Sequence, residues 1–409
     1  MPTITTETNS PKPTVIAEVE KLVYGGDGLA RVEGEILLTS FVLPGEQIEV
    51  TANRAKTGLL RGRSPRIVRP SEGRTQPRCE YFANCGGCHY QHAEYDLQLQ
   101  AKRGILQETL RRLGGITYEG EIGTVSGTPW NYRNRVQLHS NERHIGFRKA
   151  ESHDLCPITH CEISSPALND AITKLSQAVQ QKEWPSFLRT IELFTNEDQM
   201  QLSVVESMRP VAARFFSWCE TLIPSLVPDP LDYKVADHSF RISRGSFFQV
   251  NRFLIQDLVA EALMGAEGKS ALDLYAGVGL FSLPLAQRFM EVMAVERSAP
   301  AYRDLEWNAA RNSDNVRATK MPAEAFLQQL TDTPDLIVAD PPRAGLGKEA
   351  IEQLLRLLPP KLTYVSCDIA TLARDLRKLT STYVIDRLTL VDLFPQTYHF
   401  ESVVHLRRK

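Results

Sequence analysis

The sequence has 409 residues, which is too long for one ordinary hydrophobic core, so two or three domains are expected. Hydrophobic residues make up 42% of it, charged residues 23% and aromatic residues 8%, as in soluble globular proteins. No apolar run is long enough to cross a bilayer, and the polar residues 1–12 lack the apolar core of a signal peptide. These features exclude a helical membrane protein and predict a cytoplasmic location without a membrane partner.

The net charge is only -2, so the protein as a whole is not basic, but its cations are unevenly distributed. Between Ala52 and Arg78 there is a single acid, Glu72, among eight cations. These cations are Arg54, Lys56, Arg61, Arg63, Arg66, Arg69, Arg74 and Arg78. Such a patch suits a phosphate backbone, although a solvated face with no binding role has the same composition.

Residues 1–13 are polar and rich in threonine and proline, and we predict a disordered tail there. Residues 14–70 show short alternating strands separated by glycine turns. The expected strands are Val15–Val23, Leu29–Val32, Glu35–Leu38, Gln47–Val50 and Gly58–Ile67. Five strands in so short a segment predict a small closed barrel of the OB type, which is either an RNA-binding module or purely structural.

The seven cysteines, in a chain without an export signal, argue against a disulfide framework. Cys79, Cys85 and Cys88 lie on one short loop, where Gly86-Gly87 allows the backbone to fold around an ion or cluster. Four thiolates suit zinc or an iron–sulfur cluster, and spacing alone does not decide between them.

The fourth ligand of such a site must come from elsewhere in the chain, and the candidates are Cys156 and Cys161. The nearby His89 and His92 keep zinc as an alternative to a cluster.

The middle of the chain predicts a helix and then a mixed α/β region. The helix is expected over Tyr95–Leu113 and ends at the C-cap signal Gly114-Gly115. The strands and helices expected after it are Asn134–Ser140, His144–Arg148, Ala167–Gln181, Thr190–Asn196, Met200–Val205 and Val211–Ile223. A second group of cations lies in this region, namely Arg133, Arg135, Arg143, Arg148 and Lys149.

A glycine turn organises the last third of the chain. An apolar strand ending at Leu274 is followed by Gly277 and Gly279, and then by a helical pattern. Such a turn brings backbone N–H groups close to a ligand at the carboxyl end of a parallel sheet. The next strand ends in Glu296, 23 positions after Asp273, the separation at which dinucleotide-type folds place an acid on ribose hydroxyls.

Three later segments place reactive side chains at strand ends. Leu336–Ala339 runs into Asp340, Leu362–Ser366 runs into Cys367, and Glu401 precedes the last strand. Because such ends meet at one edge of a sheet, they predict an active site.

A thiolate, a base and a methyl sulfonium together suit one reaction, the alkylation of carbon 5 of a pyrimidine. A thiolate such as that of Cys367 adds to carbon 6 and makes carbon 5 nucleophilic, and a base such as Glu401 then removes the carbon-5 proton. The target base must first leave its stack, and an aromatic ring such as Phe247 could hold it.

These motifs resemble the RNA 5-methyluridine methyltransferases that use S-adenosylmethionine, in the ribosomal-RNA branch with a TRAM domain and a [4Fe–4S] cluster. The resemblance extends from about Pro13 to Arg407. Besides the cysteine loop, it rests on the sequences Phe247–Asn251, Asp340–Arg343, Ser366-Cys367 and Phe394–Glu401.

The resemblance implies Cys367 as the nucleophile, Glu401 as the base and Phe247 as the contact to the flipped uracil. It implies cofactor contacts from Gln249, Tyr275, Glu296 and Asp340, to which the glycine turn adds Gly277. It implies cluster ligation by Cys79, Cys85, Cys88 and Cys161.

The implied fold is a Rossmann-like S-adenosylmethionine-dependent methyltransferase domain with an N-terminal OB-like barrel and a mixed α/β iron–sulfur domain. The implied domains are a tail (1–13), the TRAM barrel (14–70), a central RNA-binding iron–sulfur domain (71–94 and 125–245) and a catalytic domain (95–124 and 246–409). We expect a monomer that acts on RNA, with large-subunit (23S) ribosomal RNA as the substrate and transfer RNA as the alternative.

The chain departs from the family pattern at two places. Asp368-Ile369 replaces Asn-Pro after the nucleophile, and Gln396 replaces a histidine. An acid beside Cys367 would raise the pKa of the thiol if its side chain pointed toward it.

Three other functions fit parts of the pattern. Asp340-Pro341-Pro342 is similar to a motif of amino-group methyltransferases, but Arg343 stands where those enzymes have an aromatic residue. A cytosine-5 methyltransferase shares the thiol chemistry, although Glu401 suits uracil better. A catalytically inactive iron–sulfur RNA-binding protein is the alternative without catalysis.

Overall fold

The computed structural model describes residues 14–409, and the predicted tail lies outside them. The chain forms two compact units. The first contains the described residues up to Ala83 together with Cys88–Ala101 and Gln396–Tyr398, and the second contains the rest. This division follows contacts, and the domain limits expected from the sequence stay predictions. Within the described residues, no helix combines the length and apolar character that crossing a membrane requires.

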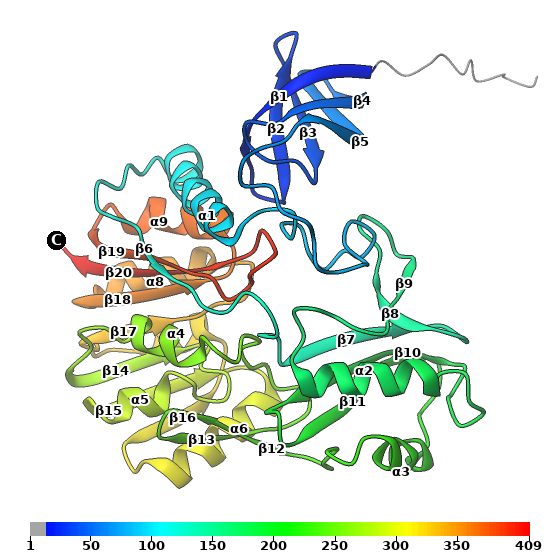
Figure 1. The fold of residues 1–409 in the computed structure, drawn as a ribbon. Coiled ribbons are helices and arrows are strands. Elements are labelled where there is room, and N and C mark those ends of the chain that lie inside the picture. Colours follow the sequence, from blue (N-terminus) through cyan, green and yellow to red (C-terminus); the bar gives the residue numbers. More distant parts are fainter. Residues whose placement is uncertain (1–13) are drawn as a thin grey trace, which may run out of the picture. The chain divides into compact units, whose positions relative to one another are not determined.

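The first unit contains a five-stranded closed barrel, drawn in blue in Figure 1. Its strands, in the order β1-β2-β3-β5-β4, are β1 Thr14–Leu22, β2 Asp27–Val32, β3 Glu35–Ser40, β4 Gln47–Lys56 and β5 Leu59–Arg69. Alternate residues point inward, so that Val19, Leu37 and Ile48 form an apolar interior. The predicted barrel is confirmed, and β1 closes it by pairing with β4.

An eight-stranded sheet dominates the second unit (Figure 1), in the order β16-β15-β14-β17-β18-β20-β19-β6. These strands are β6 Gly123–Val125, β14 Gly268–Leu274, β15 Phe289–Glu296, β16 Val316–Lys320, β17 Leu336–Ala339, β18 Lys361–Ser366, β19 Tyr383–Val391 and β20 Glu401–Arg408. The strands from β16 to β18 are parallel, and β20 is antiparallel to both neighbours. The strand order reverses between β14 and β17, which is where ligands bind in open α/β sheets.

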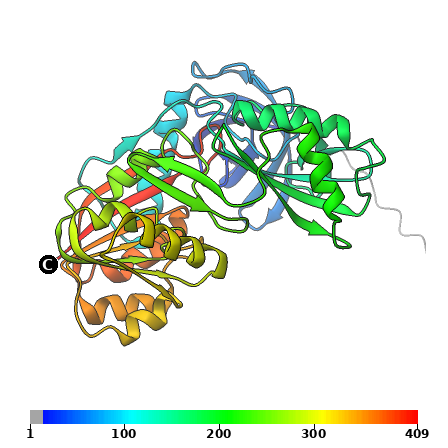
Figure 2. The same ribbon diagram turned by 90° about the horizontal axis from the view of Figure 1, so that it is seen from below.

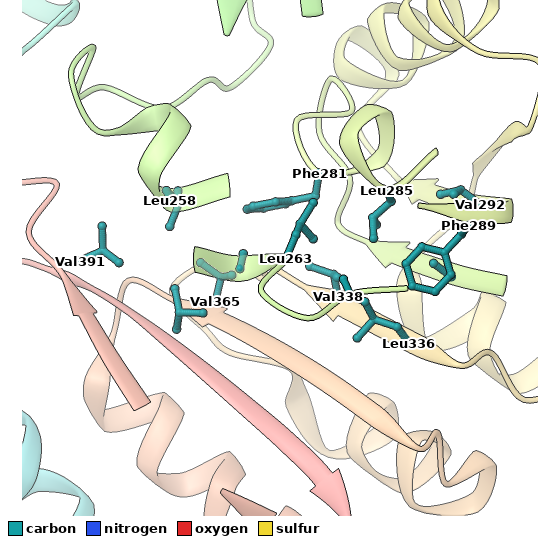
Figure 3. Packing of buried hydrophobic residues seen from close by; sticks show 14 of the residues in the cluster. Leu258, Leu263, Phe281, Leu285, Phe289, Val292, Leu336, Val338, Val365 and Val391 are labelled. Atoms are coloured by element: carbon teal, nitrogen blue, oxygen red, sulfur yellow. The ribbon is translucent and has the colours of Figure 1, made fainter. Parts of the chain in front are cut away.

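Helices cover both faces of this sheet, as Figure 2 shows. They are α4 Ile255–Ala262, α5 Ser282–Ala286, α6 Ala299–Asn312, α7 Ala323–Gln329, α8 Gly347–Leu357 and α9 Ile369–Leu379. Leu258 of α4 and Leu285 of α5 pack with Val338 and Val365 of the sheet in one buried cluster (Figure 3). This cluster holds the strand ends rigid, so side chains placed there have fixed positions.

The predicted helix before the eight-stranded sheet is α1 Tyr95–Thr109, which continues as a π-helical turn, η1 Leu110–Gly114. It ends at Gly115 in the left-handed conformation (φ +65°), as predicted.

The region after α1 contains an antiparallel sheet, a β-hairpin and two helices. The sheet has the order β11-β10-β7-β8-β9, and β12 pairs only with β13. The elements are β7 Arg135–Ser140, β8 Ile145–Arg148, β9 Leu155–Pro157, α2 Pro166–Ala178, β10 Leu188–Thr195, β11 Met200–Ser207, α3 Ala213–Leu222, β12 Leu231–Val235 and β13 His238–Ile242. The four strands and two helices predicted here are confirmed to within a few residues.

Candidate active site

The glycine turn joins β14 to α5 at the reversal of the strand order. Gly277 (φ +57°) and Gly279 (φ +96°) adopt left-handed conformations. A Cβ on Gly279 would lie 3.0 Å from the Leu305 side chain, so a close approach adds to the need for glycine there. Tyr275 also has a positive φ (+62°), which costs a non-glycine residue about 1–3 kcal/mol. This strain beside the turn is typical of a functional site.

Glu296 ends β15 beside this turn and is 9% exposed. Its Oε2 accepts a hydrogen bond from the Gly277 amide at 2.9 Å, and its Oε1 accepts one from the Ser298 amide at 2.6 Å. Each oxygen retains a second lone pair, so the carboxylate can also accept hydrogen bonds from a diol. The structure thus brings the predicted residues Glu296 and Gly277 together.

Asp273 is a further carboxylate of the turn, and no role was predicted for it. It is fully buried on β14, and its Oδ2 accepts a hydrogen bond from Ser282 Oγ at 2.5 Å. Burial, together with Asp340 and Glu296, raises the pKa of Asp273 to about 7, although the Ser282 hydrogen bond opposes this shift. The sequence feature that could have identified Asp273 as a candidate functional residue is the presence of an acid inside an apolar strand.

Cys367 and Glu401 are neighbours at the ends of adjacent strands. Ser366 of β18 pairs with Ser402 of β20, so the next residues along, Cys367 and Glu401, follow this pair at the same edge of the sheet. Burial raises the pKa of the Cys367 thiol to about 12, and the carboxyl groups of Glu401 and Asp340 act in the same direction. The predicted thiol, base and strand-end acid are therefore within electrostatic reach of one another.

Glu401 is 4% exposed, and burial and the nearby Asp340 raise its pKa well above the usual range. Burial likewise raises the pKa of Asp340 to about 7. Arg343 opposes these effects by lowering the pKa values of both Glu401 and Cys367. Glu401 Oε2 is buried without a hydrogen-bond partner, which is a rare condition for a carboxyl group and is typical of a reactive one.

Asp368, the first departure from the family pattern, is the N-cap of α9. Its Oδ1 accepts a hydrogen bond from the Thr371 amide at 2.8 Å, so the carboxylate is directed at the helix. The groups that raise the pKa of Cys367 are Glu401 and Asp340, and Asp368 is not one of them. The acid after Cys367 therefore has a structural role.

Gln396, the second departure, belongs to the first unit and is 2% exposed. Its amide oxygen accepts a hydrogen bond from Gln98 Nε2 at 3.0 Å, and its backbone N–H donates to Gln98 Oε1 at 3.0 Å. Its backbone carbonyl oxygen accepts hydrogen bonds from the backbone amides of His89 and Tyr90. The glutamine thus fixes its own loop through four hydrogen bonds.

Phe247 and Phe248 are adjacent but have opposite environments. Phe247 is 63% exposed, whereas Phe248 is buried among Tyr233 and Phe240. An exposed aromatic ring next to a buried anchor suits stacking on a base, as predicted for Phe247. Gln249, the predicted cofactor contact, is 4% exposed, and its backbone carbonyl accepts a hydrogen bond from Asn134 Nδ2.

The predicted cluster ligands do not form a closed metal site in the structure. Cys79 and Cys88 belong to the first unit, and Cys85 and Cys161 to the second. Between residues 14 and 409, no group of three or more His, Cys, Asp and Glu side chains is arranged to hold a metal ion. All seven cysteines are free of disulfides, so the thiols that a cluster needs are present.

Two residues considered as metal ligands have other roles. Burial and the Arg74 cation lower the pKa of His92 to about 4, and its ring packs against those of Phe41 and Phe82. The buried Cys156 Sγ lies 3.4 Å from Asn84 Nδ2, and burial raises its pKa. Both side chains are buried, and neither lies in a group that is arranged to hold a metal ion among the described residues.

The basic patch on the barrel is largely neutralised. At least five of its eight cations form ion pairs, namely Arg54–Glu35, Arg61–Asp27, Arg66–Glu49, Arg69–Glu18 and Arg74–Glu46. In the second group of cations, Arg135 is partly buried, lies 4.2 Å from the centre of the Phe194 ring and pairs with Glu192. The positive character that the sequence suggested for these segments is therefore reduced.

The fold and the site together define an S-adenosylmethionine-dependent methyltransferase. The crystal structure of a tRNA (uracil-54, C5)-methyltransferase from Pyrococcus abyssi, in complex with S-adenosyl-L-homocysteine, matches with a TM-score of 0.78. The two sequences are 26% identical, and the match covers 95% of this chain and 99% of that one. The Rossmann-like fold predicted from the motifs is confirmed.

Sequence comparisons identify the family. The family model of tRNA (Uracil-5-)-methyltransferases matches residues 225–409. An uncharacterized RNA methyltransferase of Aquifex aeolicus is 32% identical, over 96% of this chain and 98% of that protein. The 23S rRNA (uracil(1939)-C(5))-methyltransferase RlmD of Pectobacterium atrosepticum is 32% identical, over 98% of this chain and 95% of that protein. The chain therefore belongs to the family of RNA uracil-C5 methyltransferases.

Proposed function

We propose that the protein methylates carbon 5 of a uracil in RNA, with S-adenosylmethionine as the methyl donor. The observation that carries this proposal is that Cys367 and Glu401 follow the Ser366–Ser402 pair of β18 and β20, at the same edge of the sheet as the glycine turn. A nucleophile and a base at one edge of the sheet are what carbon-5 alkylation needs. An amino-group methyltransferase would have no use for the thiol.

In the proposed reaction, the Sγ of Cys367 gives up its proton to solvent and adds to carbon 6 of the uracil. The ring becomes an enolate, and its carbon 5 would take the methyl group from S-adenosylmethionine, which would leave as S-adenosylhomocysteine. Glu401 then accepts the carbon-5 proton, and the C6–Sγ bond breaks to release 5-methyluracil and the thiolate. Arg343 favours the ionised forms of Cys367 and Glu401 because it lowers the pKa values of both.

We assign the cofactor site to Tyr275, Gly277, Glu296, Gln249 and Asp340. The free space beside Gly277, where a Cβ would meet nothing within 4 Å, leaves room for a ligand against the backbone. Glu296 would accept hydrogen bonds from the ribose hydroxyls with its remaining lone pairs. Isothermal titration with S-adenosylhomocysteine tests this assignment, because Glu296→Ala should weaken binding by roughly tenfold or more.

We propose large-subunit ribosomal RNA as the substrate. The support is the 32% identity to the Pectobacterium protein, whose name gives 23S rRNA, over nearly the full length of both chains. The Pyrococcus protein, whose name gives tRNA, is 26% identical, and transfer RNA is therefore the second candidate. Both unmodified RNAs should be incubated with the protein and labelled S-adenosylmethionine, alongside Cys367→Ala.

The expected result is label in 5-methyluridine of the ribosomal RNA and none with Cys367→Ala. Label in transfer RNA alone would move the proposal to the second substrate. RNA binding without any product would favour the catalytically inactive iron–sulfur protein.

We also propose that Cys79, Cys85, Cys88 and Cys161 hold a [4Fe–4S] cluster. The support is that the four cysteines form no disulfide and that the pKa of Cys156 is raised, which makes that residue a poor fourth ligand. Iron and acid-labile sulfide should be measured after anaerobic purification. Loss of both in Cys161→Ser, but not in Cys156→Ser, is the expected result. Full iron content in Cys161→Ser would refute the ligand set.

A further inference from the structure

Helix α6 holds the segment that leads into Phe247. Asp304 is fully buried on this helix, and its carboxylate accepts three hydrogen bonds from the turn before Phe247. The donors are the Ser243 amide at 2.7 Å, Ser243 Oγ at 2.6 Å and Ser246 Oγ at 2.6 Å. Ser246 directly precedes Phe247 in the sequence. The Asp304 carboxylate therefore fixes the backbone from which the exposed aromatic ring extends.

One helical turn later, Asn308 contacts two segments at once. Its Oδ1 accepts a hydrogen bond from the Arg241 amide at 2.8 Å, and its Nδ2 donates to the Arg241 carbonyl at 3.1 Å. The same Nδ2 donates to the Val278 carbonyl at 2.9 Å. Val278 lies between Gly277 and Gly279, so one amide joins the glycine turn to the segment before Phe247.

The two residues act from one face of α6, because positions four apart lie above one another on a helix. Leu305, from the same helix, packs against Gly279 so closely that a Cβ there would contact its side chain at 3.0 Å. The glycine turn therefore contacts α6 through the hydrogen bond from the Asn308 side chain to the Val278 carbonyl and through a tight apolar contact. A movement of the glycine turn must therefore move α6 or break these contacts. A movement of the Ser243–Ser246 segment must likewise move α6 or break its hydrogen bonds to Asp304.

We propose that Asp304 and Asn308 are positioning residues that couple cofactor binding at the glycine turn to binding of the target base at Phe247. The proposal rests on the proposed function, which assigns cofactor contact to Gly277 and base contact to Phe247. It goes beyond that function because neither residue touches a ligand. Order imposed on one turn by the cofactor is passed to the other, so the two ligands strengthen each other's binding.

Reciprocity gives a measurable quantity, the factor by which S-adenosylhomocysteine changes the affinity for RNA. By linkage, RNA must change the affinity for S-adenosylhomocysteine by the same factor. For the unmodified protein we expect tighter RNA binding by roughly fivefold or more when S-adenosylhomocysteine is bound.

The test uses the full-length protein and fluorescence anisotropy with a short uridine-containing RNA, with and without S-adenosylhomocysteine. Asn308→Ala removes the shared amide, and Ser246→Ala removes one donor to Asp304. Asn312→Ala is the matched control, because Asn312 lies one turn further along α6 and its Nδ2 donates to the Asn308 carbonyl of the same helix. The KM for RNA and the kcat of methylation are measured in parallel.

Asn308→Ala should reduce the coupling factor to near one. Ser246→Ala should raise the KM for RNA by roughly tenfold and lower the coupling factor, with the affinity for S-adenosylhomocysteine alone unchanged. Asn312→Ala should behave as the unmodified protein. If Asn308→Ala does not fold, the coupling factor of Ser246→Ala decides whether the proposal stands.

The proposal is overturned if the unmodified protein shows no coupling, or if both variants retain it in full. It is also overturned if Asn312→Ala loses as much coupling as Ser246→Ala. Coupling without 5-methyluridine product would refute the proposed function and leave the role of α6 intact, so the two failures are distinguishable.

Discussion

Asp368 Oδ1 accepts a hydrogen bond from the Thr371 amide at 2.8 Å and thereby caps helix α9 directly after Cys367. The acid stands where the family pattern has asparagine, and aspartate and asparagine are about equally suited to an N-cap position.

Removal of this cap should affect stability more than catalysis. Asp368→Ala should lower the free energy of unfolding by about 1 kcal/mol, whereas Asp368→Asn should leave it nearly unchanged. Urea denaturation measures both. The dependence of kcat/KM on pH should be the same in all three proteins, and a shift to lower pH in Asp368→Asn would show that the acid does act on the thiol.

The pH dependence of the reaction should follow the ionisation of Cys367 and Glu401. Because burial raises the pKa values of both groups, that of Cys367 to about 12, kcat/KM should rise with pH across the neutral and alkaline range. Arg343→Gln removes a cation that lowers both pKa values, so its profile should move to higher pH, with kcat/KM at neutral pH lower by roughly tenfold. Lys348→Gln, a loss of an exposed cation on α8, is the control. An unchanged profile in Arg343→Gln would contradict this account.

Asp273 predicts how stability depends on pH in the cofactor-free protein. Burial raises its pKa from 3.8 to about 7, so the folded protein keeps a proton that the unfolded chain releases near pH 4. The contribution of Asp273 to the free energy of unfolding is therefore fully present below about pH 4 and is lost as the pH rises through about 7. Asp273→Asn should flatten this part of the stability curve, while the exposed Asp332→Asn should not. Equal curves for the unmodified protein and Asp273→Asn would refute the raised pKa.

The buried ion pair of Lys102 and Asp392 predicts a strong dependence of each residue on its partner. Both side chains are fully buried, and Lys102 Nζ lies 2.7 Å from Asp392 Oδ1 and 3.1 Å from the Phe394 carbonyl oxygen. Lys102→Met or Asp392→Leu alone leaves an unpaired buried charge and should cost about 3–5 kcal/mol. The double variant should recover most of this loss in urea denaturation. Additive losses would show that the pair does not act as a unit.

The sequence predicted the elements whose apolar residues face the core. The strands before Gly277 and Asp340 are short apolar runs, and the barrel strands alternate, so both patterns were visible. Helix α6 was not predicted, because Asp304 and Asn308 occupy inward-facing positions where an amphipathic helix normally has apolar residues. Its polar inner face is also the reason that it can hold two turns.

The electrostatics of the molecule were less accessible than its motifs. A count of cations on the barrel could not reveal that Arg54 pairs with Glu35 on another strand, since that contact depends on register. Similarly, the spacing of Cys367 and Glu401 in the sequence gave no measure of their burial, which is the main cause of their raised pKa values.

Glu401→Gln should separate the two halves of the reaction. Cys367 can still add to carbon 6 and carbon 5 can still be methylated, but the carbon-5 proton then has no acceptor, so the C6–Sγ bond cannot break. We therefore expect a covalent protein–RNA adduct that survives denaturing electrophoresis, with product formation lower by roughly a hundredfold or more.

Two further variants control for this result. Cys367→Ala/Glu401→Gln lacks the thiol and should form no adduct, which would identify the bond as one to Cys367. Glu401→Asp keeps a carboxyl group on a shorter side chain and should release its adduct slowly, because the proton acceptor is displaced and not lost. Product formation by Glu401→Gln at the rate of the unmodified protein would mean that another group accepts the proton, and Asp340, which raises the pKa values of both Cys367 and Glu401, would then be the residue to replace.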